Sequence, residues 1–150
     1  MAEVLGTVAS AIAVIELAAK TARLCTQYCK DVSNAKDDIE RIQTEVASLS
    51  TITESVQELL EGPRGAKLRT AQALDTALRS GQSQLETLHN TLKPSKSRSA
   101  ANRLRLRSLK WPFESKDVEK TVLALARCGQ TIQAALQVDQ TYVGNPLSIL

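Results

Sequence analysis

The feature that most constrains this chain is an apolar run close to its N-terminus. Residues Val4–Ala19 read VLGTVASAIAVIELAA, and Glu16 is the one charged side chain among them. A surface helix of a soluble protein carries a wide polar face, which this run lacks. A membrane-spanning helix needs about 20 apolar residues, whereas this run has 16. Such a helix must hide two of its faces, against its own bundle, other copies of the chain, or lipid.

The composition favours packed helices over a sheet. Of the 150 residues, 43% are hydrophobic but only 3% are aromatic, so Leu, Ile, Val and Ala must form the core. Sheets prefer β-branched and aromatic residues. A charged fraction of 23% is ordinary for a globular chain, and the length fits a single domain.

Apolar residues recur at helical spacing in four segments, residues 3–29, 35–60, 64–92 and 116–142. We expect Asn34 and Ser115 to be N-caps, Gly62-Pro63 and Lys93-Pro94 to end helices, and Gly81 to permit a close helix contact. The apolar stripes are Val4, Val8, Ala11, Ile15, Ala18, Ala22, Cys25 and Cys29, with Leu5, Ile12 and Leu24 on a second stripe; Ile39, Ile42, Val46, Leu49, Val56 and Leu59; Ala71, Leu74, Leu78, Leu85, Leu88 and Leu92; and Val118, Val122, Leu125, Gly129, Ile132 and Leu136.

Four such helices predict an all-α fold, a four-helix bundle over residues 1–142 followed by a tail or linker over residues 143–150. An irregular helical domain is the alternative.

Positive charge is concentrated in the long connection between the third and fourth helices. Residues 1–60 carry 9 acidic and 5 basic side chains, whereas residues 61–150 carry 7 acidic and 14 basic ones. Each basic residue near an anionic membrane is worth about 1 kcal/mol. The predicted lipid-binding residues are Lys93, Lys96, Arg98, Arg103, Arg105, Arg107 and Lys110. The alternative is a solvated loop.

Two further patterns bear on a membrane role. Gly6 and Ser10 are small residues spaced by four, which allows close helix contact, and Glu16 would be costly in lipid unless it is paired or faces water. Trp111 and Phe113 either anchor at a membrane interface or, as we favour, pack at the end of the bundle.

Little in the sequence points to catalysis. His89 is the one histidine, no glycine-rich phosphate loop occurs, and the spacing of Cys25, Cys29 and Cys128 matches no common zinc site. The sequence lacks a recognisable nucleic-acid-binding module and a signal peptide. We therefore expect a reduced, cytoplasmic protein that is not an enzyme, with buried structural thiols, no metal and no cofactor.

The chain resembles a known family at three places. These are VLGTVASAIAVIELAAKTARL at residues 4–24, IERIQTEVASLSTITESVQELL at residues 39–60, and LKWPFESKDVEKTVLALAR from Leu109 to Arg127, the most specific of the three. They resemble the HeLo-like (HELL) N-terminal domain of fungal STAND-type, NOD-like receptors, related to HeLo domains of heterokaryon-incompatibility proteins and similar to the four-helix bundle of mixed-lineage kinase-like executioners.

This resemblance implies a cell-death effector of fungal innate immunity that forms a homo-oligomer, binds anionic lipids and permeabilises the plasma membrane. An upstream or attached NLR-type nucleotide-binding receptor would gather the copies, and the domain would move from the cytoplasm to the plasma membrane. The first helix would insert through Val4, Leu5, Val8, Ile12, Val14, Ile15 and Leu17. The alternative function is a non-lytic helical adaptor that clusters partner proteins.

Overall fold

The computed structural model describes residues 2–32, 34–63, 71–93 and 111–144, with side chains described between Val4 and Val138. Four α-helices occupy these residues: α1 (Ala2–Asp31), α2 (Lys36–Glu61), α3 (Ala71–Leu92) and α5 (Ser115–Gly144). The all-α fold and the bundle are confirmed. The start of the third helix, predicted at residue 64, and the tail after residue 144 lie outside the described residues.

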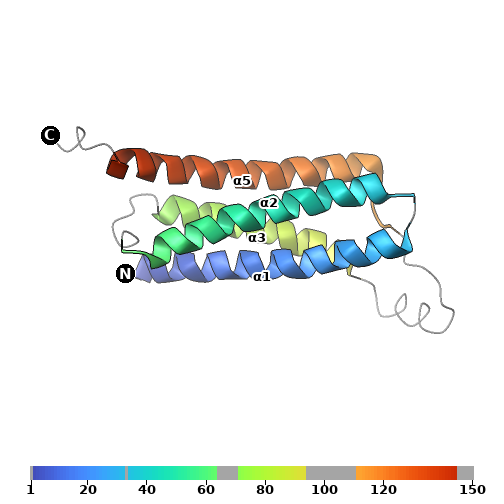
Figure 1. Ribbon diagram of the computed structural model, residues 1–150, viewed down its shortest axis with the longest axis horizontal. Helices are drawn as coiled ribbons and strands as arrows, with labels where there is room; N and C mark the ends of the chain where they lie inside the picture. Colours follow the sequence, from blue (N-terminus) through green and yellow to red (C-terminus); the bar gives the residue numbers. More distant parts are fainter. Residues whose placement is uncertain (1, 33, 64–70, 94–110, 145–150) are drawn as a thin grey trace.

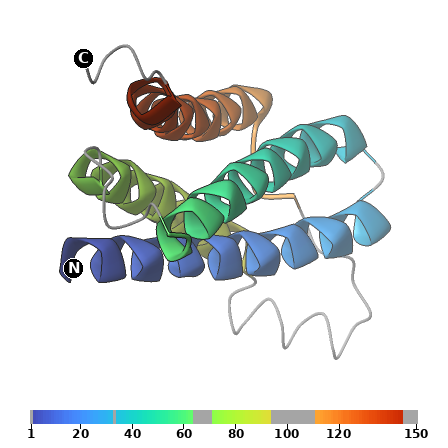
Figure 2. The same cartoon turned by 60° about the vertical axis from the view of Figure 1, so that its left-hand side comes forward.

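The helices alternate in direction and form a bundle in which α1 and α5 lie on opposite sides (Figure 1). α1 packs against α2 and α3, and α5 packs against the same two helices from the other side. Figure 2 shows α2 and α3 between the outer helices. α1 therefore has one side on the bundle and one side open.

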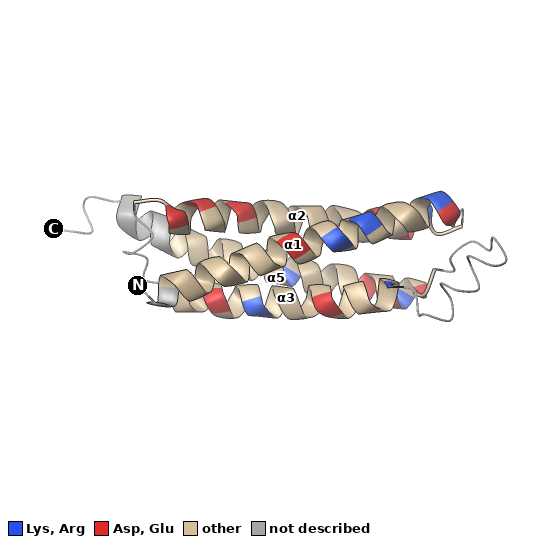
Figure 3. Cartoon of the chain, turned by 90° about the horizontal axis from the view of Figure 1, so that it is seen from below, with Lys and Arg blue, Asp and Glu red and all other residues tan. Residues whose placement is uncertain are grey.

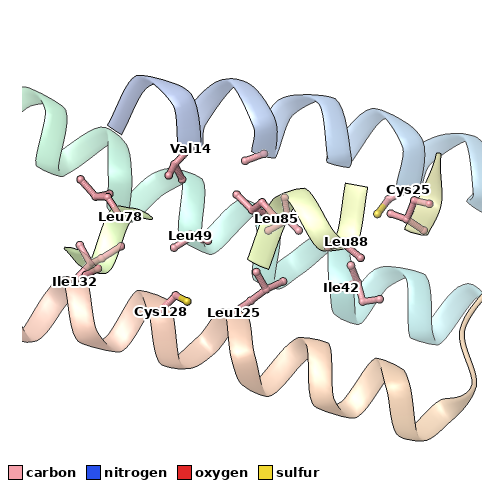
Figure 4. Close-up of a cluster of buried hydrophobic side chains, with 14 of the residues drawn as sticks. Val14, Cys25, Ile42, Leu49, Leu78, Leu85, Leu88, Leu125, Cys128 and Ile132 are labelled. Atoms are coloured by element: carbon pink, nitrogen blue, oxygen red, sulfur yellow. The ribbon is translucent and has the colours of Figure 1, made fainter. Parts of the chain in front are cut away.

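An aliphatic core runs the length of the bundle, with side chains from all four helices meeting in it (Figure 4). The predicted stripe of the third helix is confirmed, since all six of its apolar residues are buried. The stripe of the second helix differs in detail because Leu60, rather than Leu59, is fully buried. Thr53, a polar interruption of that stripe, is also buried and donates its hydroxyl proton to Leu49 O at 2.7 Å.

The stripe predicted for the first helix is confirmed at Ala11, Ala18 and Cys25, and its other five residues are half-buried. The buried face of the helix follows Thr7, Ala11, Val14, Ala18, Thr21, Cys25 and Tyr28, whereas Val4, Val8, Ile15, Ala22 and Cys29 are half-buried beside it. The difference has a physical cause. Serine and threonine hydroxyls can bond to a carbonyl one turn earlier, as Thr21 does to Leu17 O at 2.8 Å, so these residues can be buried in a helix.

The predicted N-caps are also wrong. Ala35 occupies the cap position of α2, with no side-chain cap hydrogen bond within the described part of the chain. Ala35 is buried while Asn34 is exposed, so the connection turns inward one residue later than expected. α5 begins at Ser115. The backbone N–H of Glu114, the residue before the helix, donates a hydrogen bond to Asp117 Oδ2 at 3.2 Å, so the Asp117 carboxylate caps the start of the helix.

The close helix contact occurs at a different glycine from the one expected. A Cβ added at Gly81 would meet Leu49 Cδ2 at 3.7 Å, which is ordinary van der Waals contact. A Cβ added at Gly129 would lie 3.1 Å from Ile52 Cδ1, so this side chain would have to move. The tightest glycine contact therefore lies between α2 and α5.

Candidate membrane-inserting helix

The first half of α1 presents apolar side chains to solvent. Leu5 is 70% exposed and Ile12 is 38% exposed, and Ala9, one turn from each, is exposed as well. These three residues, which we call the exposed apolar stripe, share one face of the helix because they are spaced by four and three. From Val4 onward, the first charged side chain of α1 lies near the middle of the helix (Figure 3). The stripe ends at Glu16, which is exposed.

The seven residues predicted to insert occupy three different environments. Leu5 and Ile12 are exposed, whereas Val14 is fully buried in the core. The other four, Val4, Val8, Ile15 and Leu17, are half-buried. In this bundle the helix therefore exposes a narrow apolar stripe, and exposing all seven residues would require α1 to leave α2 and α3.

The three polar positions singled out in the sequence also differ. The Ser10 hydroxyl lies 2.8 Å from Asp75 Oδ1 on α3 and 3.2 Å from Gly6 O, and either atom can accept its proton. Gly6 is exposed, and a Cβ added there would meet no described atom within 4 Å. Ser10 thus contacts a neighbouring helix, whereas Gly6 makes no close helix contact in the described structure.

Two further hydroxyls, neither of them predicted from the sequence, join α1 to α3. The Thr7 hydroxyl donates to Ala71 O at 3.3 Å, and the Tyr28 hydroxyl donates to Leu92 O at 2.7 Å. Together with Ser10–Asp75 they form what we call the α1–α3 polar contacts. All three donors are buried. For Thr7 and Ser10 the signal in the sequence is a polar residue within an apolar segment, whereas Tyr28 lies in a polar stretch.

Aromatic side chains close the end of the bundle where α1 finishes. The Tyr28 and Trp111 rings meet edge to face with centroids 5.3 Å apart, and Phe113 lies 5.1 Å from Trp111. Trp111 and Phe113 both pack against the core, which confirms the preferred interpretation of this pair. Trp111 Nε1 is buried without a hydrogen-bond partner in the described structure.

Of the predicted lipid-binding residues, the structure describes one. Lys93 follows the last turn of α3 and is exposed, and its N–H donates to His89 O at 2.8 Å. The other six, Lys96, Arg98, Arg103, Arg105, Arg107 and Lys110, lie outside the described residues. Their role in lipid binding stays a prediction.

Two described titratable groups, Cys25 and Arg41, have shifted pKa values. Burial, with a smaller effect of Cys29, raises the pKa of the Cys25 thiol to about 12, so it remains protonated near neutral pH. All three cysteines are free. The described residues contain no group of three or more His, Cys, Asp or Glu side chains that could hold a metal ion. On the surface, a hydrogen bond and the charge of Glu119 raise the pKa of Arg41.

By length and composition, α1 is able to cross a membrane. An 18-residue window within Val4–Asp31 has a mean hydropathy of 1.6, and a third of it is buried in the bundle. Core helices of soluble bundles share this composition.

Comparison of the chain with models of known families, with curated proteins and with solved structures finds no match.

Proposed function

We propose that this chain is a membrane-permeabilising effector of regulated cell death, of the HeLo-like class that its sequence resembles. Several copies assemble, α1 enters the bilayer, and the basic segment from Lys93 to Lys110 attracts anionic lipid. In this proposal the protein moves from the cytoplasm to the plasma membrane after an NLR-type receptor gathers it.

The observation that supports this proposal is the exposed apolar stripe on α1. Leu5 at 70% exposure places a large apolar side chain in water at a cost that burial would recover, about 25 cal/mol per Å². The stripe lies within residues 4–15, which contain no charged side chain. Lipid or a second copy of the chain would cover it.

The bundle also indicates what insertion requires. At 1.5 Å per residue the 30 residues of α1 measure about 45 Å, longer than the roughly 30 Å of a hydrocarbon core. The apolar part alone is shorter, so Glu16 must reach water or a partner. Release of α1 also requires breaking the α1–α3 polar contacts.

The test is dye release from liposomes with and without anionic lipid. The variants Leu5→Asp and Ile12→Asp change exposed residues, so the bundle should persist, and we expect both to lose most of the leakage. The matched control is Leu123→Asp, which places the same charge at a 48% exposed apolar residue of α5. Equal leakage from wild type and all three variants would exclude the insertion role of α1.

A non-lytic adaptor is the second candidate, and the core positions of α1 favour it. Ala11, Val14, Ala18 and Cys25 are at most 1% exposed, as in a permanent core helix. An adaptor would remain a stable soluble protein that ignores anionic liposomes at physiological salt. Absence of leakage even after forced clustering through a fused oligomeriser would decide for this function.

A further inference from the structure

Among the described side chains, α5 is joined to the rest of the bundle mainly by apolar burial. Its buried residues are Val118, Leu125, Cys128, Gly129, Ile132 and Leu136. Between described side chains, two polar contacts join it to its neighbours. Arg41 on α2 pairs with Glu119 at 2.7 Å, and the Ser80 hydroxyl lies 3.9 Å from Cys128 Sγ. The ion pair is solvent-exposed and contributes little to stability.

α1 is joined in a different way. The three α1–α3 polar contacts are directional hydrogen bonds from buried donors, so they fix the register of one helix against the other. Apolar burial, in contrast, is non-directional. An α5 helix of identical sequence from another copy would satisfy the α2–α3 face equally well.

Two surface grooves run beside α5. A cleft of about 240 Å³ lies between α3 and α5, where Ala77, Ser80 and Cys128 are among its lining residues. A second cleft, of about 210 Å³, lies between α2 and α5 beside Ile52 and Gly129.

The chain is long enough to carry α5 to a neighbour. The connection between Leu92 and Ser115 comprises the 22 residues 93–114. At up to about 3.3 Å per residue it can span about 70 Å, more than the roughly 45 Å length of α5. Trp111 and Phe113, at the end of this connection, pack on the core beside Tyr28 and would have to move with α5 onto the second copy.

We propose that α5 is exchanged between copies of this chain. The α2–α3 face beneath α5 is then an interaction surface, and its occupant is the α5 helix of a second copy. Exchange of an identical element builds a dimer without a newly designed interface, because each contact of the monomer is kept. This inference rests on the proposed function only in that the function requires several copies to assemble.

A disulfide between two differently altered chains tests the exchange. A Cβ added at Gly81 lies 3.9 Å from the Cys128 Cβ, within the range of about 3.5–4.5 Å found in disulfides. One chain carries Gly81→Cys and Cys128→Ala together with an affinity tag, and the other chain is unaltered. The bond can form between them only when α5 of the unaltered chain lies on α3 of the tagged chain.

The two chains are mixed, partly unfolded, refolded at high concentration without lipid, and mildly oxidised. We expect a covalent tagged–untagged dimer on a non-reducing gel, reversed by dithiothreitol, with peptide mass spectrometry locating the bond at positions 81 and 128. A single chain with Gly81→Cys and native Cys128 is the geometric control, because it forms the bond within a closed monomer.

Two results would overturn the exchange. One is a mixture that stays monomeric by light scattering after the same refolding. The other is an oligomer in which the bond between positions 81 and 128 never joins the tagged chain to the untagged one. The exchange test contains no lipid, so it is independent of the liposome test. If α5 is exchanged but the protein does not release dye from liposomes, only the membrane function is refuted. If dye is released but α5 is not exchanged, only this inference is refuted.

Discussion

At the scale of single residues, hydroxyl groups decide how α1 is placed. The core of the bundle is aliphatic, and an aliphatic helix can rotate or slide with little change in buried area because apolar burial is non-directional. Buried hydroxyls remove that freedom, since each must find its acceptor or pay for desolvation. Thr7, Ser10 and Tyr28 therefore fix the position of α1 on α3.

We predict that Ser10→Ala destabilises the protein by about 1–2 kcal/mol, because a hydrogen bond to a carboxylate is lost. Asp75 keeps its ion pair with Arg79, at 2.9 Å, so the carboxylate is not left without a partner. Urea unfolding measures the change. Ser55→Ala is the matched control, an exposed serine on α2 whose removal should change stability by less than about 0.5 kcal/mol. Equal effects of the two variants would contradict a specific role for Ser10.

A second prediction concerns Cys25 and the dependence of protein stability on pH. Burial raises the pKa of the Cys25 thiol from 9.0 to about 12. Between these two pH values the thiol keeps its proton in the folded state and has lost it in the unfolded state. This contribution is fully present below pH 9 and declines as the pH rises, by about 1.4 kcal/mol per unit. Between pH 8 and pH 10, wild type should lose about 1.4 kcal/mol more than Cys25→Ala in urea unfolding. Equal losses of stability in wild type and Cys25→Ala would show that the thiol ionises as readily in the folded protein as in the unfolded one.

At the scale of elements, α1 separates into two faces with different tolerance for charge. Val14→Asp would place a carboxylate in the aliphatic core, and we expect it to cost more than about 3 kcal/mol and to unfold a marginal protein. Ile12→Asp changes a residue that is 38% exposed and should cost about 1 kcal/mol or less. Circular dichroism during thermal unfolding distinguishes them. If Ile12→Asp unfolds the protein as readily as Val14→Asp, then the exposed apolar stripe is assigned to the wrong face.

The two buried glycines give a matched comparison of the α3 and α5 packing. Alanine is favoured over glycine inside a helix by about 0.5–1 kcal/mol. Gly81→Ala should keep this gain because its Cβ meets only ordinary contacts, whereas Gly129→Ala should lose part of it because Ile52 Cδ1 lies 3.1 Å away. Chemical unfolding of both variants gives the order. A larger gain at Gly129 would mean that α2 and α5 approach less closely than described.

At the scale of the whole molecule, charge is divided along the sequence. The excess of acidic side chains falls in residues 1–60 and the excess of basic ones in residues 61–150. A membrane role would use the basic segment between α3 and α5 for attraction and α1 for insertion. Attraction and insertion are then separable, because different residues serve them.

We predict that replacing Arg103, Arg105 and Arg107 by glutamine weakens binding to anionic vesicles about 100-fold, since each charge contributes about 1 kcal/mol. Raising the salt concentration to 1 M, where the Debye length is about 3 Å, should abolish wild-type binding as well. Vesicle sedimentation measures both.

The control removes three exposed cations elsewhere, Arg79, Lys120 and Arg127, and should weaken binding by less than about tenfold. Equal losses in the two triple variants would mean that net charge, rather than the basic segment, governs attraction.

The sequence alone determined the class of this fold, because three of its four helices carry a single unambiguous apolar stripe. All six apolar residues of the third stripe are buried as expected, and the second and fourth stripes each have one half-buried member, Leu59 and Val122. Where one face is apolar and the other polar, burial of the apolar face leaves one orientation.

Only the tertiary structure decided the orientation of α1 and the identity of its exposed residues. Because this helix is apolar on more than one side, its hydrophobic pattern fits several rotations almost equally well. The acceptors at Ala71, Asp75 and Leu92 select one of them, and they lie 64 or 65 residues away from their donors in the sequence. That choice buries Val14, leaves Leu5 and Ile12 in water, and so defines the stripe on which the proposed membrane function rests.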